Sequence, residues 1–102
     1  MAWIKLAEQD QLADGEMIGL KAGGVAVALY RDGGEYFATS NICTHQYALL
    51  TDGYFEDGCI ECPLHQGSFD IRTGRALCAP VTEDVQVFPV KIEGGQVFVE
   101  IA

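Results

Sequence analysis

Short apolar runs alternate with glycine-containing turns along most of the chain, and a helical period is almost absent. Runs rich in Val, Ile, Phe and Tyr between turn residues are typical of strands, because these side chains suit a pleated, half-buried surface. We expect strands at Trp3–Leu6, Met17–Lys21, Val25–Tyr30, Glu35–Thr39, Ile60–Cys62, Ser68–Ile71, Val85–Lys91 and Val97–Ile101. A short helical turn is expected over Ala7–Leu12. The pattern therefore predicts an all-β fold class.

Paired glycines divide several of these runs. They stand at Gly23-Gly24, Gly33-Gly34 and Gly94-Gly95. Each pair predicts a hairpin, because glycine supplies the positive φ that a tight turn requires. In the last run, Val97, Val99 and Ile101 share one face of the strand, which is the alternation of a half-buried strand.

The length and composition limit what the chain can be. With 102 residues, 49% apolar and 21% charged, it is expected to form a single domain over residues 1–102 and not a disordered segment. It has 15 Asp and Glu against 6 Lys and Arg, a net charge of −9. Nucleic acid is therefore not expected as a partner, because phosphate contacts need clustered basic residues.

The chain shows no apolar run long enough to cross a bilayer and no signal peptide, so no membrane association is expected. We expect a cytoplasmic protein, whose thiols stay reduced. In that compartment, 4 cysteines indicate metal or redox chemistry more than disulfides.

Two segments break the strand rhythm, and together they hold every histidine of the chain. Cys43-Thr44-His45 and Cys62-Pro63-Leu64-His65 are separated by sixteen residues. A Cys and a His two or three residues apart on a tight loop can point at one metal site. Two such loops would supply four ligands.

Two thiolates and two imidazoles suit either one tetrahedral zinc ion or a Rieske [2Fe–2S] cluster. Zinc fingers keep their cysteines together and their histidines together, whereas each loop here holds one of each. The chain is also larger than a module that needs zinc to fold. We favour the cluster, and a zinc-binding interaction module without a redox role remains the alternative.

The two motifs resemble those of the Rieske-type ferredoxins of bacterial aromatic-ring-hydroxylating dioxygenases, above all the naphthalene dioxygenase type. The resemblance also extends over Thr73–Val81 and Phe88–Ile92. It implies a Rieske fold of three antiparallel sheets, with two cluster-binding loops at one tip. A loop around Ala79-Pro80 would cover the cluster.

The resemblance also implies the ligands and the function. Cys43 and Cys62 would bind the inner iron of one [2Fe–2S] cluster per chain, and His45 and His65 would bind the outer iron. The protein would be a monomeric electron carrier in aromatic hydrocarbon catabolism, not an enzyme by itself. It would pass single electrons from a flavin-dependent NAD(P)H ferredoxin reductase to the Rieske centre of a terminal oxygenase. The alternative within electron transfer is a small Rieske subunit of another oxidoreductase, nitrite reductase-like.

Several other side chains invite an interpretation. Cys59 and Cys78 are expected to be small buried apolar residues. Trp3 is expected in the core or at a sheet edge, and Glu56-Asp57 in a solvated turn. Three residues are expected around the cluster tip: Tyr47, Leu64 and Pro80.

Rieske proteins of respiratory complexes resemble this chain at the four ligands but have a disulfide between the cluster loops and hydroxyl donors near the cluster. The disulfide positions correspond to Ala48 and Leu64, and the hydroxyl positions to Gly67 and Phe69. The chain thus lacks both features. We expect a reduction potential near the low end of the Rieske range, about −150 mV.

Overall fold

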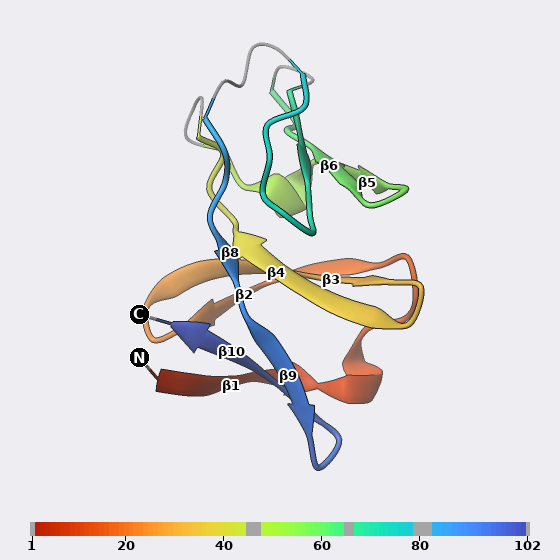
Figure 1. The fold of residues 1–102 in the computed structure, drawn as a ribbon, viewed down its shortest axis with the longest axis vertical. Coiled ribbons are helices and arrows are strands. Elements are labelled where there is room, and N and C mark those ends of the chain that lie inside the picture. The colour runs from red at the N-terminus through yellow and green to blue at the C-terminus, as the bar shows by residue number, and fades with distance from the viewer. Residues whose placement is uncertain (1, 45–47, 65–66, 79–82, 102) are drawn as a thin grey trace.

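The computed structural model describes residues 2–44, 48–64, 67–78 and 83–101, and most of its regular structure is strand (Figure 1). The elements in chain order are β1 (Ala2–Glu8), the 3-10 helix η1 (Gln9–Gln11), β2 (Met17–Ala22), β3 (Val25–Asp32), β4 (Glu35–Ser40), the 3-10 helix η2 (Leu50–Asp52), β5 (Tyr54–Glu56), β6 (Cys59–Glu61), β7 (Ser68–Asp70), β8 (Val87–Phe88), β9 (Val90–Glu93) and β10 (Gln96–Ile101). The predicted all-β fold class is confirmed.

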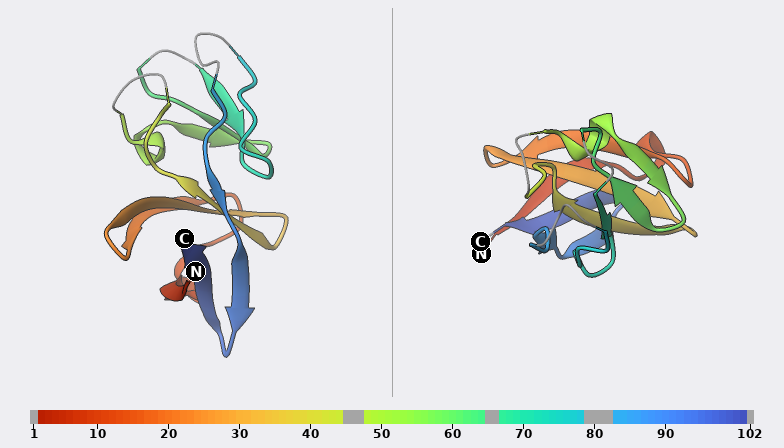
Figure 2. Two further views of the ribbon diagram at one scale, coloured as in Figure 1. Left: turned by 60° about the vertical axis from the view of Figure 1, so that its left-hand side comes forward. Right: turned by 90° about the horizontal axis from the view of Figure 1, so that it is seen from above.

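The strands form three antiparallel sheets, as expected. Two of them, with strand orders β1-β10-β9 and β2-β3-β4-β8, make up a base. The third, β5-β6-β7, lies at the other end of the molecule (Figures 1 and 2). We call it the loop-bearing sheet, because Cys62 of the second predicted ligand motif directly follows β6.

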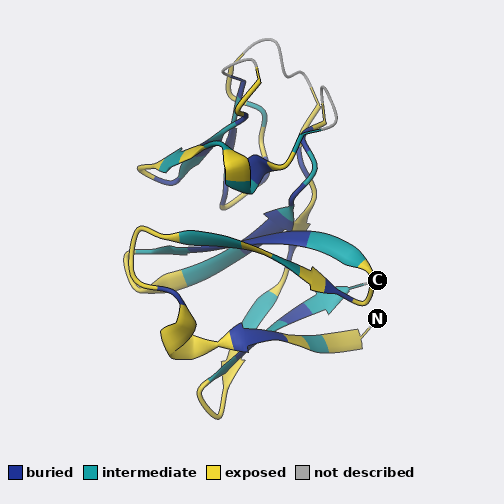
Figure 3. Ribbon diagram, turned by 180° about the vertical axis from the view of Figure 1, so that it is seen from behind, coloured by how far each residue is buried: buried dark blue, intermediate teal, exposed yellow. Residues whose placement is uncertain are grey.

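Buried side chains fall into two clusters that match this division (Figure 3). The first lies in the base, and the second lies under the loop-bearing sheet. Strand β3 contributes to both clusters, Val27 and Leu29 to the first, Ala28 and Tyr30 to the second. Because side chains alternate along a strand, β3 is buried on both faces and joins the two cores. The predicted burial of Val97 and Val99 in the base is confirmed.

The strand predicted over Val85–Lys91 is wrong in one respect, because the structure divides it at Pro89. Strand β8 before Pro89 pairs with β4, and strand β9 after it pairs with β10 in the other base sheet. Proline has no N–H to donate to a sheet ladder, so it suits a point where the chain leaves one sheet for another. Pro89 therefore marks the crossing between the two base sheets.

The other differences are smaller. Strand β5 has no counterpart among the predicted strands, and Cys62 lies just after β6 instead of inside a strand. The helical turn expected over Ala7–Leu12 is the shorter η1, while β1 continues to Glu8. At the start of η1, the backbone N–H of Glu8 donates to Oε1 of Gln11 over 3.2 Å.

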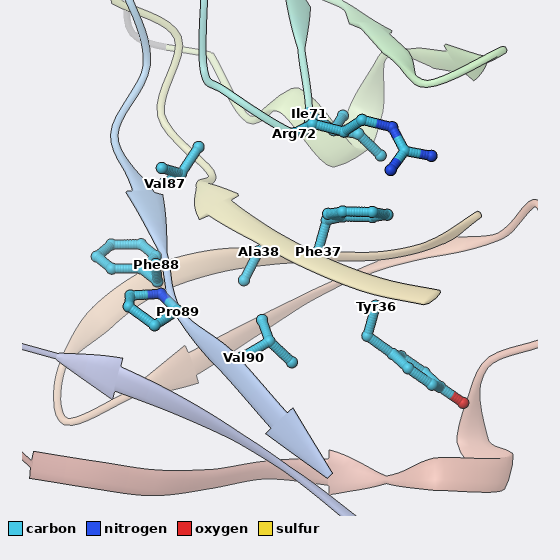
Figure 4. A pocket seen from close by; sticks show the side chains of 9 residues that line it. All are labelled: Tyr36, Phe37, Ala38, Ile71, Arg72, Val87, Phe88, Pro89 and Val90. Atoms are coloured by element: carbon cyan, nitrogen blue, oxygen red, sulfur yellow. The ribbon is translucent and has the colours of Figure 1, made fainter. Parts of the chain in front are cut away.

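The loop-bearing sheet rests on the β3–β4 hairpin through Arg72. Its guanidinium lies 4.5 Å from the ring centroid of Phe37 and 3.6 Å from carboxylates of both Asp32 and Glu35. Beside this contact is a hollow of about 360 Å³ that reaches to Val87 (Figure 4). Neither Cys43 nor Cys62, the two predicted ligands among the described residues, lines this hollow.

Candidate metal centre

The first predicted ligand segment leaves the base at the end of β4. An isolated bridge between Ile42 and Leu49 brings its two ends together, and the backbone N–H of Cys43 donates to the carbonyl of Ala48 over 3.0 Å. Cys43 is only 4% exposed and belongs to the second buried cluster. The first segment is thus a closed loop with its cysteine in the core.

The second predicted ligand segment is closed in the same way. The backbone N–H of Cys62 donates to the carbonyl of Gly67 over 2.8 Å, and Cys62 is 1% exposed in the same cluster as Cys43. In both segments the acceptor stands five residues after the cysteine, and the predicted histidine lies between the two. The structure therefore brings two equivalent loops to one end of one core.

The two predicted histidine ligands, His45 and His65, lie outside the described residues. Tyr47 and the predicted covering residues Ala79 and Pro80 also lie outside them. Leu64, expected near the cluster tip, is 60% exposed in the second loop.

Thr44, which lies between the two predicted ligands of the first loop, has a contact that sequence reasoning missed. Its hydroxyl donates to the carbonyl of Glu83 over 2.8 Å. The neighbouring Asp84 accepts the backbone N–H of Ala76 through its carboxylate over 2.9 Å. These bonds tie the first loop, the segment after β7 and the segment before β8 together. Nothing in the local sequence around Thr44 signals a bond to a carbonyl 39 residues away.

The other two cysteines differ from Cys43 and Cys62. Cys59 stands on β6, three residues before Cys62, so alternation turns its side chain away from the core. It is half-buried, and burial together with the charges of Asp70 and Asp57 raises the pKa of its thiol. Cys78 is exposed, so the prediction that it is a buried apolar residue is wrong. It directly follows Leu77, whose backbone N–H donates to the carbonyl of Ser68 on β7 over 2.8 Å.

The other singled-out residues lie largely as expected. Trp3 stands on β1, the edge strand of its sheet, and is 39% exposed, with Nζ of Lys91 4.6 Å from its ring centroid. Glu56 and Asp57 are exposed and lead into the turn at Gly58, where Asp57 has a φ of 52°.

The donors that the structure describes fit an iron–sulfur cluster. Cys43 and Cys62 are both buried in one core. A thiolate, which is the form that binds metal, is costly to bury unless a cation or a metal centre compensates its charge. Among the described residues no group of three or more Cys, His, Asp or Glu side chains could hold a single metal ion. Two buried thiols on matched loops are the donor set expected for the inner iron.

Comparison with known proteins assigns the chain to one protein family. The Rieske [2Fe-2S] domain family matches residues 2–89, and the chain belongs to that family. Its cofactor is accordingly a Rieske-type [2Fe–2S] cluster.

The similarity to particular electron carriers covers nearly the whole chain. The ferredoxin component of the naphthalene 1,2-dioxygenase/salicylate 5-hydroxylase systems of Ralstonia sp. is 48% identical, over 97% of this chain and 95% of the relative. The ferredoxin component of the naphthalene 1,2-dioxygenase system of Pseudomonas putida is 46% identical, over 98% of this chain and 96% of the relative. Both relatives are ferredoxin components of dioxygenase systems.

Solved structures agree with this similarity. The ferredoxin of carbazole 1,9a-dioxygenase from Nocardioides aromaticivorans has a TM-score of 0.92 at 36% identity, covering 97% of each chain. A complex of oxygenase and ferredoxin in carbazole 1,9a-dioxygenase contains a chain with a TM-score of 0.89 at 34% identity, covering 95% of this chain and 91% of that one. No helix among the described residues is long and apolar enough to span a membrane.

Proposed function

We propose that this protein is the ferredoxin component of an aromatic-ring-hydroxylating dioxygenase system. It carries single electrons from a flavin-dependent NAD(P)H reductase to the Rieske centre of a terminal oxygenase. The observation that carries the proposal is the pair of matched loops with buried Cys43 and Cys62, in a chain similar over almost its full length to such ferredoxins. It is an electron carrier and not an enzyme by itself.

The proposal assigns four ligands. Cys43 and Cys62 hold the inner iron, and His45 and His65 hold the outer iron. The bound cluster supplies the one-electron chemistry, and the chain supplies ligation, burial and a docking surface. The chain has 2 histidines, so ligation leaves none for general acid–base catalysis.

The described residues keep the inner side of the centre dry. Leu50, Ile60 and Phe69 are all fully buried in the core that holds both cysteines. Apolar contacts on this side leave the loop end of the molecule as the place where a partner can approach. Electron transfer is therefore expected through that end.

The partners and setting follow from this role. The complex of a related ferredoxin with its oxygenase supports the terminal oxygenase as one partner. The reductase, a monomeric state and a cytoplasmic location, where NAD(P)H is available, are part of the proposal.

Reconstitution tests the function. The purified protein is combined with the reductase and terminal oxygenase of the Pseudomonas putida naphthalene 1,2-dioxygenase system, in place of the related ferredoxin. We expect NAD(P)H-dependent oxidation of naphthalene that depends on this protein. A zinc-containing, colourless preparation without acid-labile sulfide would contradict both the cofactor and the function.

Ligation is tested separately at His65. A third thiolate adds negative charge, so His65→Cys is expected to lower the reduction potential or to prevent cluster assembly. Voltammetry and the visible spectrum of the purified variant measure this. An unchanged spectrum and potential would show that His65 is not a ligand.

The small subunit of a nitrite reductase is not favoured by any observation. Structures of such subunits are 20% and 24% identical to this chain, which shows a shared fold alone.

A further inference from the structure

The outer face of the loop-bearing sheet carries half-buried and exposed side chains. Strand alternation turns Phe55, Ile60 and Phe69 inward, where they join the second core. The side chains that face outward are Tyr54, Glu56, Cys59, Glu61, Ser68 and Asp70. This outward set is dominated by acidic and polar groups, with one aromatic ring.

A hollow of about 170 Å³ lies within this face. Its lining consists of Tyr54, Glu56, Cys59, Glu61 and Ser68. Across the strands, Tyr54 pairs with Glu61, and Glu61 pairs with Ser68. Glu56 is the diagonal neighbour of Glu61, a relation that separates side chains by roughly 7–8 Å. Both carboxylates therefore line one hollow.

No salt bridge among the described residues compensates the negative charge of the hollow. Among the described residues neither Glu56 nor Glu61 forms a salt bridge. Between residues 41 and 86 the chain has seven Asp or Glu, two Arg and no Lys. One of these arginines, Arg72, is already engaged by Asp32 and Glu35. The face is thus complementary to a positively charged group.

Cys59 lines the same hollow. Burial is the main cause that raises the pKa of its thiol, and the negative charges of Asp70 and Asp57 raise it further. Of these causes only the negative charges favour a cation nearby, because burial disfavours any charged group.

We propose that this hollow receives one basic side chain, Arg or Lys, from the docking face of the terminal oxygenase. A space of about 170 Å³ is below the range of roughly 300–1,000 Å³ typical of sites for small organic molecules. The described residues offer no group of three side chains for a metal ion. A single cation fits both limits, because two carboxylates line the hollow and Tyr54, 60% exposed, offers its ring as a cation–π surface.

The position of the hollow suits a contact that guides electron transfer. Glu61 directly precedes Cys62, and the exposed Leu64 follows in the same loop. A partner with its cation in the hollow therefore lies against the second ligand loop. This inference rests on the proposed function, because it specifies how the oxygenase is recognised.

The test compares variants of equal net charge. Glu56→Gln and Glu61→Gln each remove one charge from the hollow, and Asp10→Asn removes one charge in the base, on η1. Each holoprotein is reduced and mixed with the terminal oxygenase of the Pseudomonas putida naphthalene 1,2-dioxygenase system at low salt. The dissociation constant is taken from the dependence of the transfer rate on ferredoxin concentration.

We expect each Gln variant to raise the dissociation constant about fivefold, the usual upper value for one exposed ion pair. Asp10→Asn should change it less than about twofold. Tyr54→Leu should also weaken binding, because it removes the ring while keeping an apolar side chain. Glu56, unlike Glu61, is not adjacent to a predicted ligand, and an unchanged reduction potential in Glu56→Gln shows that its effect is on docking.

The outcomes separate the two proposals. If the wild-type protein transfers electrons but the Glu56, Glu61 and Tyr54 variants behave like Asp10→Asn, the inference is overturned and the proposed function stands. If the wild-type protein transfers no electrons to the oxygenase, the proposed function fails and this inference fails with it.

Discussion

The phenol of Tyr30 lies fully buried in the second core, under the loop-bearing sheet. Its oxygen is 2.9 Å from Oγ1 of Thr39, and its ring centroid is 5.2 Å from that of Phe55. Burial raises the pKa of Tyr30 well above its ordinary value, and the bond to Thr39 offsets this only in part. A folded chain therefore keeps this phenol protonated at a pH at which an unfolded chain releases the proton.

Alkaline destabilisation is the expected result. Above pH 10 the unfolded state binds fewer protons than the folded state, so the free energy of unfolding falls by at most about 1.4 kcal/mol per pH unit. Tyr30→Phe removes this dependence and, at neutral pH, costs about 1 kcal/mol for the lost hydrogen bond. Urea unfolding at pH 7, pH 9 and pH 11 measures both effects. Tyr54→Phe, at an exposed site, is the control, and an equal pH response in both variants would contradict the assignment.

Gly67 and Phe69 stand where respiratory Rieske proteins have hydroxyl donors, and substitutions at these two positions test the reduction potential. Phe69 is fully buried in the same core as Cys43 and Cys62, and Gly67 closes the second loop. A hydroxyl donor near sulfur would stabilise the reduced state more, because that state has the extra negative charge. Gly67→Ser and Phe69→Tyr should each raise the potential by about 40 mV for a bond of about 1 kcal/mol.

Voltammetry of the holoproteins checks this result. Phe55→Tyr is the control, because Phe55 contacts the same core without occupying an aligned position. Intact clusters with no upward shift would exclude missing hydrogen bonds as the cause of a low potential. A strongly positive wild-type potential would contradict the ferredoxin function itself.

Among the connecting segments, the turn after β7 is held tightly against the segment before β8. Gly74 has a φ of 79°, and a Cβ built on it would collide with the carbonyl oxygen of Val85. The backbone N–H of Val85 also donates to the carbonyl of Gly74 over 2.8 Å. Gly95, in the β9–β10 turn, has a φ of 76° but open space around it.

Substituting alanine at Gly74 and at Gly95 distinguishes two effects, the collision with the Val85 carbonyl and the strain of a positive φ. Gly95→Ala is expected to cost about 1 kcal/mol, because a side chain disfavours positive φ, and to lower the melting temperature by about 5 °C. Gly74→Ala has the same strain and must also displace Val85, so its melting temperature should fall by more than about 10 °C. Thermal unfolding followed by circular dichroism compares them. Equal shifts would show that the contact of Gly74 with Val85 does not matter.

A strand could be predicted where its pairing strand lies nearby in the chain, and less well where the pairing strand is remote. The hairpins at paired glycines have local causes, and positive φ at Gly23, Gly33 and Gly94 bears them out. Pro89 gave a local signal, and the paired glycines join β9 to β10 locally, but the pairing of β8 with β4 links residues that are remote in sequence. Strand β5 is short and half polar, so its alternation carries little information before β6 is known to pair with it.

For the candidate metal centre as well, features with a local cause could be predicted and contacts between remote segments could not. Spacing predicts both ligand loops, and the structure places the cysteines of the two loops in one core. The contact of Thr44 with Glu83 and the exposure of Cys78 depend on where distant segments pass, and no local pattern encodes that.

At the scale of the whole molecule, the net charge of −9 acts over distances longer than any single contact. Attraction to a positively charged partner raises the association rate, and salt screens it over about 8–10 Å at physiological ionic strength. The electron-transfer rate at low ferredoxin concentration should therefore fall as salt is raised. Stopped-flow mixing with the oxygenase over a range of salt concentrations measures the slope. A rate independent of salt would indicate apolar docking through the loop ends.

The two loops that close with the same backbone bond have a consequence for speed as well as for binding. Both cysteines are fixed at the start of a loop whose ends are joined, and both are packed in one dense core. With Cys43 and Cys62 as the proposed ligands of the inner iron, gaining or losing an electron would require little movement of the sulfur atoms, because the backbone and packing already hold them in place. Ligation by these two residues would thus lower the inner-sphere reorganisation energy, which favours a carrier that exchanges electrons during brief encounters.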